Sequence, residues 1–259
     1  MKTVYLCDSS IEGILSGVYH AWSSKRGHDN VMLRLRDDGA TMELFCQYEE
    51  VPADAQKADK VITAIRNKIS EEAYEAVYKA ALSNDSGRAD KIYRFLIHGF
   101  RTGARIVSML QIQAVYDVFQ MCRFVDNETH LLTGFVRFSE MEGDLLVSRI
   151  GPKNDVIVLL APHFADRLSG ENWVLYDTNR NKAVLHPAFR PWYLTELLSP
   201  QWEDKMRKTS DEDEYEDLFK RFRKSISIRE RTNPVCQMNH MPLRYRPYMP
   251  EFSQGLRDV

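Results

Sequence analysis

The period of the hydrophobic and polar positions changes several times along the chain, and each change marks a different kind of element. Residues 2–7 read as a short strand, and Asp8, Ser9 and Ser10 are N-cap candidates for a helix that follows it. The apolar face of this helix is predicted to consist of Ile11, Leu15, Val18 and Trp22. The chain therefore opens with a strand, a cap and a helix.

Two β-prone runs follow at residues 31–36 and 41–51, and the sequence DDGA between them has the chemistry of a turn. We expect these two runs to pair as a hairpin in a small N-terminal sheet. From residue 54 to residue 125 the apolar positions recur at helical spacing. The clearest stripes are Val61, Ile65 and Ile69, then Tyr74, Val77, Tyr78 and Ala81, then Ile92, Phe95, Leu96 and Phe100. This helical block is predicted to end with a helix over about residues 109–124.

Strand patterns return after the helical block. Residues 131–140 and 144–150 are predicted strands around a turn, residues 155–169 contain a helix, and residues 172–186 form a hairpin. A last helix is indicated by Tyr215, Leu218, Phe219, Phe222 and Ile226.

We therefore predict an α+β fold with mixed small sheets, a central helical block, and a C-terminal helix plus an ordered basic extension. The chain is expected to form a single domain over residues 1–259, with residues 1–125 and 126–259 as sub-units.

Composition and charge narrow the classes of partner. With 44% hydrophobic residues the chain can bury a proper core, and its formal net charge of −2 excludes the cationic surface of a general DNA-coating protein. Binding to a polyanion must then come from local charge separation. No apolar run reaches the roughly 20 residues that cross a bilayer, and the N-terminus has no apolar signal region. We expect a cytoplasmic protein without a membrane partner.

The sharpest charge feature is a change from acidic residues 211–217 to basic residues 220–224 within one predicted helix. Stabilisation by the helix dipole explains this order, and a basic ridge for phosphates is the functional alternative. A second basic stretch recurs at helical spacing at Arg94, His98, Arg101 and Arg105, where a solvated helix face is the simpler explanation. The predicted contacts to nucleic acid are Arg94, Arg101, Arg221, Arg223, Lys224, Arg229, Arg231, Asn233, Gln237, His240, Arg244 and Tyr245.

Candidate catalytic groups are few. Asp8 and Glu12 lie four residues apart at a helix start, where caps and first-turn acids give the same pattern. The histidines have no close ligand spacing, and the common nucleotide-binding and hydrolase motifs are missing from the sequence. We therefore expect no metal site and no cofactor.

Four segments carry a resemblance to a known family. They are CDSSIEGILSGVYHAW at residue 7, LLTGFVRFSE at residue 131, LLAPHFADRLSGENWVLYDTNRNKAVLH at residue 159 and SISIRERTNPVCQMNHMPLRYR at residue 225. The chain resembles, over nearly its whole length, a bacterial family of DNA metabolism and repair that contains the domain of unknown function DUF4130. Its members are typically encoded beside a radical S-adenosylmethionine (SAM) protein associated with DNA modification or repair. Related domains are fused to a uracil-DNA glycosylase module.

The resemblance implies a partner in DNA repair. Cys7, Cys46, Cys122 and Cys236 cannot form the CxxxCxxC motif that holds the cluster of a radical enzyme, so this chain looks like the companion of the catalyst. The leading hypothesis is a DNA-binding accessory protein that presents DNA to the radical SAM protein.

Two alternatives stay open, and the sequence does not decide whether the chain is an enzyme. One is a DNA-processing enzyme, a nuclease, glycosylase or base-modifying activity, that uses Asp8, Glu12, Asn233, Gln237 and His240. The other is a protein-interaction module that uses its acidic run at residues 211–217 to hold a basic partner.

Overall fold

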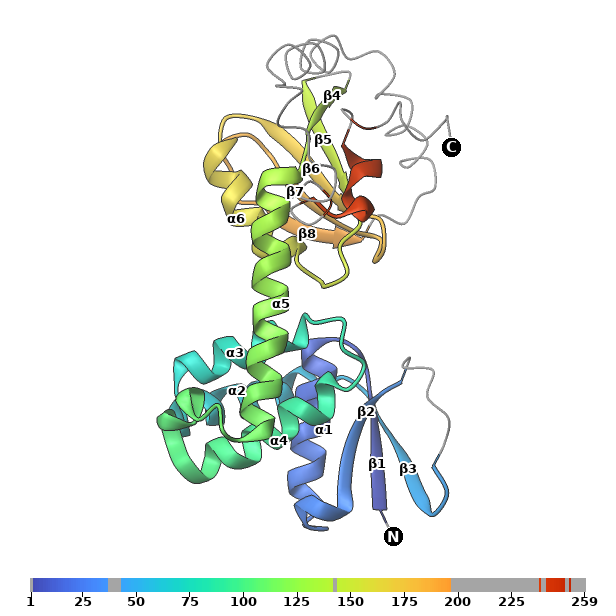
Figure 1. Ribbon diagram of the computed structural model, residues 1–259, viewed down its shortest axis with the longest axis vertical. Coiled ribbons are helices and arrows are strands. Elements are labelled where there is room, and N and C mark those ends of the chain that lie inside the picture. The colour runs from blue at the N-terminus through green and yellow to red at the C-terminus, as the bar shows by residue number, and fades with distance from the viewer. Residues whose placement is uncertain are drawn as a thin grey trace. The chain divides into compact units, whose positions relative to one another are not determined.

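The structure is a computed structural model that describes residues 2–36, 43–141, 144–196, 238, 241–249 and 252. The chain divides into two compact units, Met1–Asp126 and Asn127–Val259, and each has its own sheet (Figure 1). The division at residue 125 that we expected from the sequence lies next to this boundary. The predicted α+β class, with two small sheets, is confirmed.

The first unit contains a parallel three-stranded sheet. Its strands are β1 (Lys2–Cys7), β2 (Val31–Leu35) and β3 (Cys46–Val51), in the order β2-β1-β3. Both outer strands run parallel to β1, so the predicted hairpin between residues 31–36 and 41–51 is wrong. A hairpin would pair β2 with β3 and leave an edge of the largely buried strand β1 without backbone partners.

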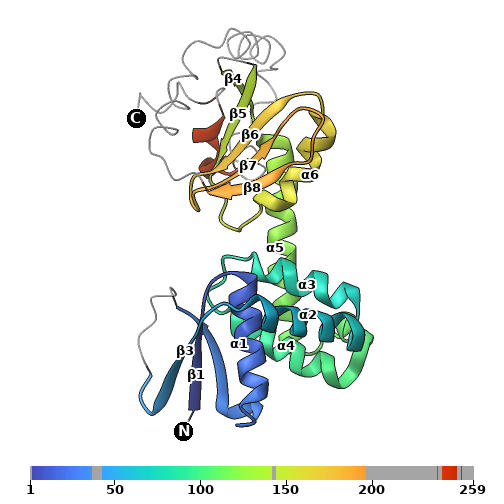
Figure 2. The same cartoon turned by 180° about the vertical axis from the view of Figure 1, so that it is seen from behind.

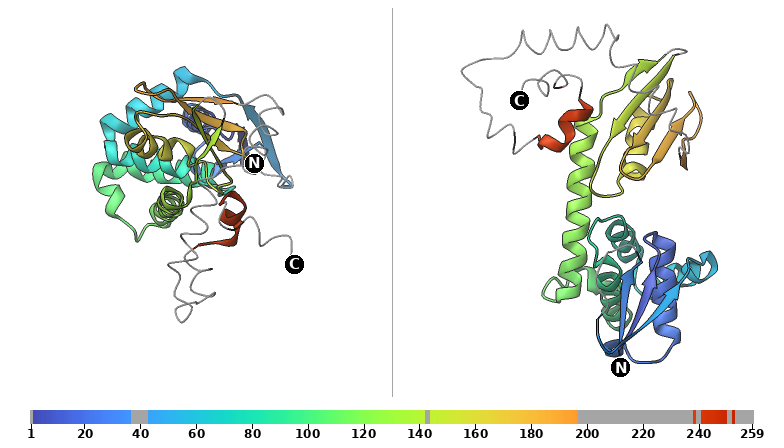
Figure 3. Two further views of the ribbon diagram at one scale, coloured as in Figure 1. Left: turned by 90° about the horizontal axis from the view of Figure 1, so that it is seen from above. Right: turned by 90° about the vertical axis from the view of Figure 1, so that its right-hand side faces the viewer.

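Helix α1 (Ile11–Ser23) packs along this sheet (Figure 3). Of the three predicted caps, Ser10 is the N-cap, because its side chain accepts a hydrogen bond of 3.0 Å from the Gly13 amide. Gly17 lies directly on the Cys7 sulfur, where a Cβ atom would collide with Sγ. On the predicted apolar face Leu15 and Val18 are fully buried, while Ile11 and Trp22 are half-buried.

The predicted helical block is confirmed. It consists of α2 (Ala55–Lys68), α3 (Glu71–Ala81), α4 (Arg88–Thr102), the 3-10 helix η2 (Gly103–Ser108) and the first part of α5 (Gln113–Phe135). Side chains of Asp54 and Ser70 cap α2 and α3. The core positions Val61, Ile65, Val77, Ile92, Phe95 and Leu96 are buried, as the three stripes predicted.

Helix α5 is longer than the sequence indicated. It continues to Phe135, so the predicted strand at residues 131–140 is wrong over its first half, and β4 (Ser139–Met141) is short. The buried residues Val125, Glu128 and Leu132 keep helical spacing beyond the predicted end of the helix at Phe124. The β-prone composition of this stretch concealed that spacing.

The second unit contains a mixed sheet of strands β4, β5 (Leu145–Ile150), β6 (Asn172–Asp177), β7 (Lys182–His186) and β8 (Tyr193–Glu196), in chain order. Only the β5–β6 pair is parallel, and α6 (Ile157–Arg167) connects these two strands. Helix α6 packs against β6 and β7 (Figure 2). The predicted helix in residues 155–169 and the hairpin at residues 172–186 are therefore confirmed.

Near the C-terminus the structure describes the 3-10 helix η5 (Leu243–Tyr248), within the predicted basic extension. The predicted helix at Tyr215 to Ile226 and the acidic run at residues 211–217 lie outside the described residues. Among the described helices, none combines the length and the apolar character needed to span a membrane.

Candidate functional site

The structure describes four of the predicted contacts to nucleic acid. Arg94 and Arg101 belong to the first unit, and Arg244 and Tyr245 belong to the second. The others lie outside the described residues, namely Arg221, Arg223, Lys224, Arg229, Arg231, Asn233, Gln237 and His240.

Arg94 connects α4 to the edge of the sheet. Its guanidinium donates hydrogen bonds of 2.6 Å to the His28 carbonyl, in the 3-10 helix η1 (His28–Asn30), and of 2.5 Å to the Val31 carbonyl. It also pairs with Asp90 at 3.2 Å, and Asp90 accepts a hydrogen bond from the Leu33 amide at 3.1 Å. These contacts engage all three guanidinium nitrogens. The structure thus gives Arg94 a structural role, and its part as a phosphate contact stays a prediction.

Tyr245 is also engaged inside the protein. Only 1% of the residue is exposed, and its hydroxyl donates a hydrogen bond of 2.8 Å to Glu128. The ring has no free face for a base, so the prediction that Tyr245 stacks on a base is wrong for this structure. Arg244 pairs with the same carboxylate at 3.2 Å and donates a 2.6 Å hydrogen bond to the Tyr245 hydroxyl. Its side chain is 37% exposed, but its charge is already matched by Glu128.

Glu128 is the centre of this cluster. Besides Arg244 and Tyr245, it accepts hydrogen bonds from the Lys153 amide at 3.0 Å and from both the amide and the side chain of Asn154 at 2.7 Å. Burial by itself would raise the pKa of Glu128, but these donors and the positive charge of Arg244 outweigh it and lower the pKa. The carboxylate therefore stays ionised and joins η5, α5 and the loop after β5.

Asp8 and Glu12 do not form an obvious catalytic pair. Asp8 accepts a hydrogen bond of 3.0 Å from the Ala53 amide and forms a 3.0 Å ion pair with Arg36, while Glu12 is exposed in the first turn of α1. These contacts support a structural role for Asp8. Within the described ranges, no group of three or more His, Cys, Asp or Glu side chains could hold a metal ion.

Of the four described contacts, Arg101 is the one without a partner among the described side chains. It is exposed, and no ion pair joins it to a carboxylate in the described part of the chain. Burial, Arg101 and Arg94, in that order, lower the pKa of His28, which places Arg101 near the side of α4 where His28 lies. Arg105 in η2 is exposed as well.

Three helices of the first unit surround a pocket that the sequence analysis missed, which we call the aromatic pocket. Its volume is about 360 Å³, and its lining comes from α1, α2 and α4. The lining residues are Val18, Tyr19, Trp22, Lys60, Val61, Ala64, Lys68 and Phe100. The signal in the sequence was weak, because Lys60, Ala64 and Lys68 recur at helical spacing on α2 as they would on any solvated face.

The lining of the aromatic pocket combines three rings with aliphatic side chains and two lysines. Trp22 and Phe100 are in edge-to-face contact with centroids 5.1 Å apart, and the Lys60 ammonium lies 5.7 Å from the centre of the Tyr19 ring. Lys60 and Lys68 are exposed, and neither forms an ion pair with a described residue. No carboxylate lines the pocket.

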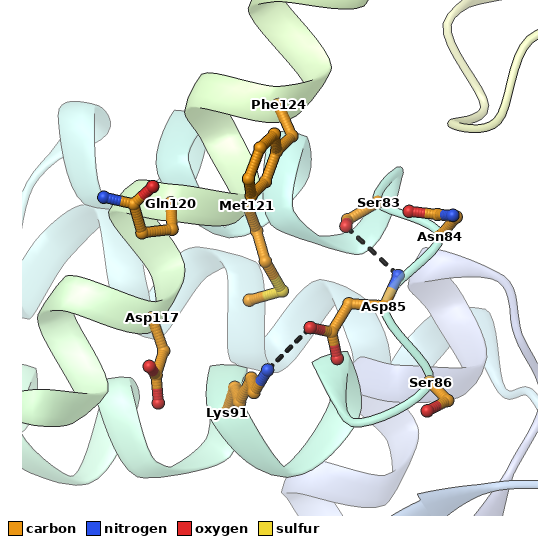
Figure 4. A pocket seen from close by; sticks show the side chains of 9 residues that line it. All are labelled: Ser83, Asn84, Asp85, Ser86, Lys91, Asp117, Gln120, Met121 and Phe124. Carbon is orange, nitrogen blue, oxygen red and sulfur yellow. Dashed lines mark hydrogen bonds and ion pairs between the residues drawn. The ribbon is translucent and has the colours of Figure 1, made fainter.

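A second hollow of the first unit, which we call the polar pocket, has the opposite electrostatic character (Figure 4). It encloses about 490 Å³ between the loop before α4 and the α5 side chains Asp117, Gln120, Met121 and Phe124. Its Lys91 ammonium is neutralised by Asp85 at 2.6 Å, and Asp117 adds a further carboxylate. With two carboxylates and one ammonium in its lining, the polar pocket disfavours a polyanion.

No curated protein matches this chain. A family model described as a domain of unknown function, DUF4130, matches residues 86–251. The matched range includes α4, α5 and the whole Glu128 cluster, whereas α1 and α2 lie before it, together with the quoted segment at residue 7. Because the match covers more than half of the chain, the protein belongs to the DUF4130 family.

Proposed function

We propose that this protein is a DNA-binding accessory protein that presents DNA to a radical SAM protein of DNA modification or repair. The observation that carries the proposal is the pair of exposed lysines, Lys60 and Lys68, at the rim of a pocket with aromatic walls and without a carboxylate. Nucleic-acid binding uses cations for the phosphates and rings for the bases. The aromatic pocket offers both on one surface.

The spacing of the two lysines suits a nucleic-acid strand. Lys60 and Lys68 are separated by eight positions on α2, which corresponds to about 12 Å along the helix axis. A stacked strand advances about 3.4 Å per nucleotide, so the two positions on α2 are separated by about 3.5 nucleotide steps. Arg101, an exposed residue that directly follows Phe100 on α4, adds a further cation to the same unit.

The cysteines support the proposal that a partner protein supplies the radical chemistry. Burial, as the largest cause, raises the pKa of Cys7 to about 12 and that of Cys122 to about 11, so both thiols are poor nucleophiles and poor metal ligands at neutral pH. The four cysteines also lack the spacing of a cluster-binding motif. Radical chemistry on DNA would then come from the second protein.

The DNA-binding part of the proposal is tested by the affinity for a fluorescent single-stranded 12-mer, measured by anisotropy at low salt. We expect Lys60→Glu/Lys68→Glu to weaken binding at least 10-fold, because it replaces two phosphate contacts with repulsion. The matched control is Lys153→Glu/Arg167→Glu, which makes the same change in net charge at exposed positions of the second unit. Equal losses in the two variants, or no binding by the wild type to single- or double-stranded DNA, would overturn the proposal.

The partner is tested separately by size-exclusion chromatography of this protein with a radical SAM protein encoded beside its gene. We expect the two to co-elute in the presence of the 12-mer. Separate elution with and without DNA would contradict the accessory role and leave DNA binding to be judged by the anisotropy experiment.

A further inference from the structure

We infer that the aromatic pocket receives one unstacked nucleobase of a single-stranded or locally opened DNA. This inference rests on the proposed function, because the base belongs to the strand whose phosphates Lys60 and Lys68 contact. It adds the class of ligand and the position where that ligand is held.

Trp22 is held in place before any ligand arrives. Its ring makes edge contacts with His28 at 5.0 Å, with Tyr93 at 5.6 Å and with Phe100 at 5.1 Å between centroids. Tyr93 is fully buried, and its hydroxyl is hydrogen-bonded to His28 at 2.8 Å, which fixes two of these three neighbours. A ring held in this way loses little conformational freedom when it contacts a base.

The partial burial of the rings distinguishes them from the core. Tyr19, Trp22 and Phe100 are half-buried and pack on the core at one side while they line the pocket at the other. A volume of about 360 Å³ is in the range of pockets that hold small ligands. Base stacking on such rings is tolerant of sequence, because every base has a π face.

The rings of the aromatic pocket also indicate whether the bound DNA is single-stranded or duplex. In a duplex both faces of a base are covered by its neighbours, so a protein ring can stack only on a base that has left the stack. The aromatic pocket is lined by side chains from three helices and suits a base that projects from its strand. We therefore expect the protein to prefer single-stranded or opened DNA to an intact duplex.

The charges at the rim favour a nucleotide over a purely apolar guest. Lys60 and Lys68 present two ammonium groups beside the rings. Asp59 is adjacent to Lys60 on α2, but neighbouring helix positions do not face each other, so Asp59 does not neutralise the Lys60 charge. His28 adds no charge at neutral pH, since its pKa is lowered by burial and by Arg101 and Arg94. An apolar side chain bound in the pocket would make favourable contacts with the rings, but it would leave both lysines without a counter-charge.

The test compares two phenylalanines in the first unit. Phe100→Leu removes a ring of the aromatic pocket, and Phe124→Leu makes the same change in the polar pocket, where the side chain is 60% exposed. Each variant is titrated with an oligo-dT 12-mer and with a strand of the same length that carries abasic sites. Thermal unfolding by circular dichroism checks that both variants are folded.

We expect Phe100→Leu to weaken binding of oligo-dT about 10-fold and to leave binding of the abasic strand unchanged. The variant should therefore bind the two strands with equal affinity. Phe124→Leu should change neither. A wild type that binds the abasic strand as tightly as oligo-dT overturns the inference, as do equal effects of the two substitutions. In those cases a loss of binding in Lys60→Glu/Lys68→Glu would still uphold the proposed function, whereas failure of the wild type to bind any strand would remove both.

A second measurement locates the base directly and does not depend on the folding of a variant. The wild-type protein is photo-crosslinked to a 12-mer with one 5-iododeoxyuridine, and the modified peptide is identified by mass spectrometry. We expect the crosslink on Tyr19, Trp22 or Phe100. A crosslink confined to other residues would contradict the inference.

Discussion

Single residues in this protein are committed to internal contacts in ways that their chemical type does not reveal. Arg94, Arg244 and Tyr245 have the composition of a nucleic-acid surface, yet Arg94 holds two backbone carbonyls and the other two hold a buried carboxylate. A cation that already pairs with a buried carboxylate contributes less free energy to phosphate binding than an unpaired cation does. Binding the phosphate would leave the buried carboxylate unpaired. In the described part of the chain, no ion pair joins Lys60, Lys68 or Arg101 to a carboxylate, and Lys60 lies over the Tyr19 ring.

Glu128 gives a prediction about acid stability. Its pKa in the folded protein is lowered, so its stabilising contribution is present above the unfolded pKa of about 4.5 and is lost as the pH falls through the folded pKa. Glu128→Gln should reduce the free energy of unfolding by about 3 kcal/mol at pH 7, because its amide nitrogen cannot accept the same donors. The difference between wild type and variant should shrink as the pH falls from 5 to 3.

Urea unfolding at pH 7, 5, 4 and 3 measures this difference. Glu140→Gln is the matched control, since Glu140 is exposed on β4, and it should stay within about 0.5 kcal/mol of the wild type. A difference between wild type and Glu128→Gln that is constant from pH 7 to pH 3 would show that the ionised carboxylate does not stabilise the cluster.

At the scale of elements, local patterns predicted the helices well and the sheet order poorly. The stripes of α2, α3 and α4 repeat within each helix, so they can be seen in a single segment. The pairing of β2 and β3 with opposite edges of β1 depends on residues far apart in the chain, and a turn-like DDGA sequence favoured the wrong partner. The aromatic pocket was missed for a related reason, since its rings and lysines come from three helices.

The contact between α4 and the sheet edge can be tested through Arg94. Arg94→Ala should lower the free energy of unfolding by about 2–3 kcal/mol, because it removes the ion pair with Asp90 and the hydrogen bonds to the carbonyls of His28 and Val31. Arg101→Ala, an exposed residue on the same helix, should change it by less than about 0.5 kcal/mol. Urea unfolding at neutral pH provides both values, and similar losses in the two variants would contradict the structural role of Arg94.

At the scale of the whole molecule, most of the DNA contacts predicted from the sequence fall in the C-terminal stretch, between Arg221 and Tyr245. Two of these contacts, Arg244 and Tyr245, are described and belong to η5, where they are bound to Glu128 in the second unit. Among the described residues, the exposed cations Lys60 and Lys68 line the aromatic pocket of the first unit together with three rings. A chain with a net charge of −2 would then bind DNA through one local surface, and the strength of that binding must depend on salt.

The most direct measurement of this claim is the salt dependence of binding to the single-stranded 12-mer. Each phosphate contact contributes about 0.7 to the slope of log affinity against log salt, so Lys60→Glu/Lys68→Glu should reduce the magnitude of that slope by about 1.4 relative to the wild type. The control Lys153→Glu/Arg167→Glu should keep the wild-type slope. An unchanged slope in Lys60→Glu/Lys68→Glu would contradict the claim that these two lysines hold the strand.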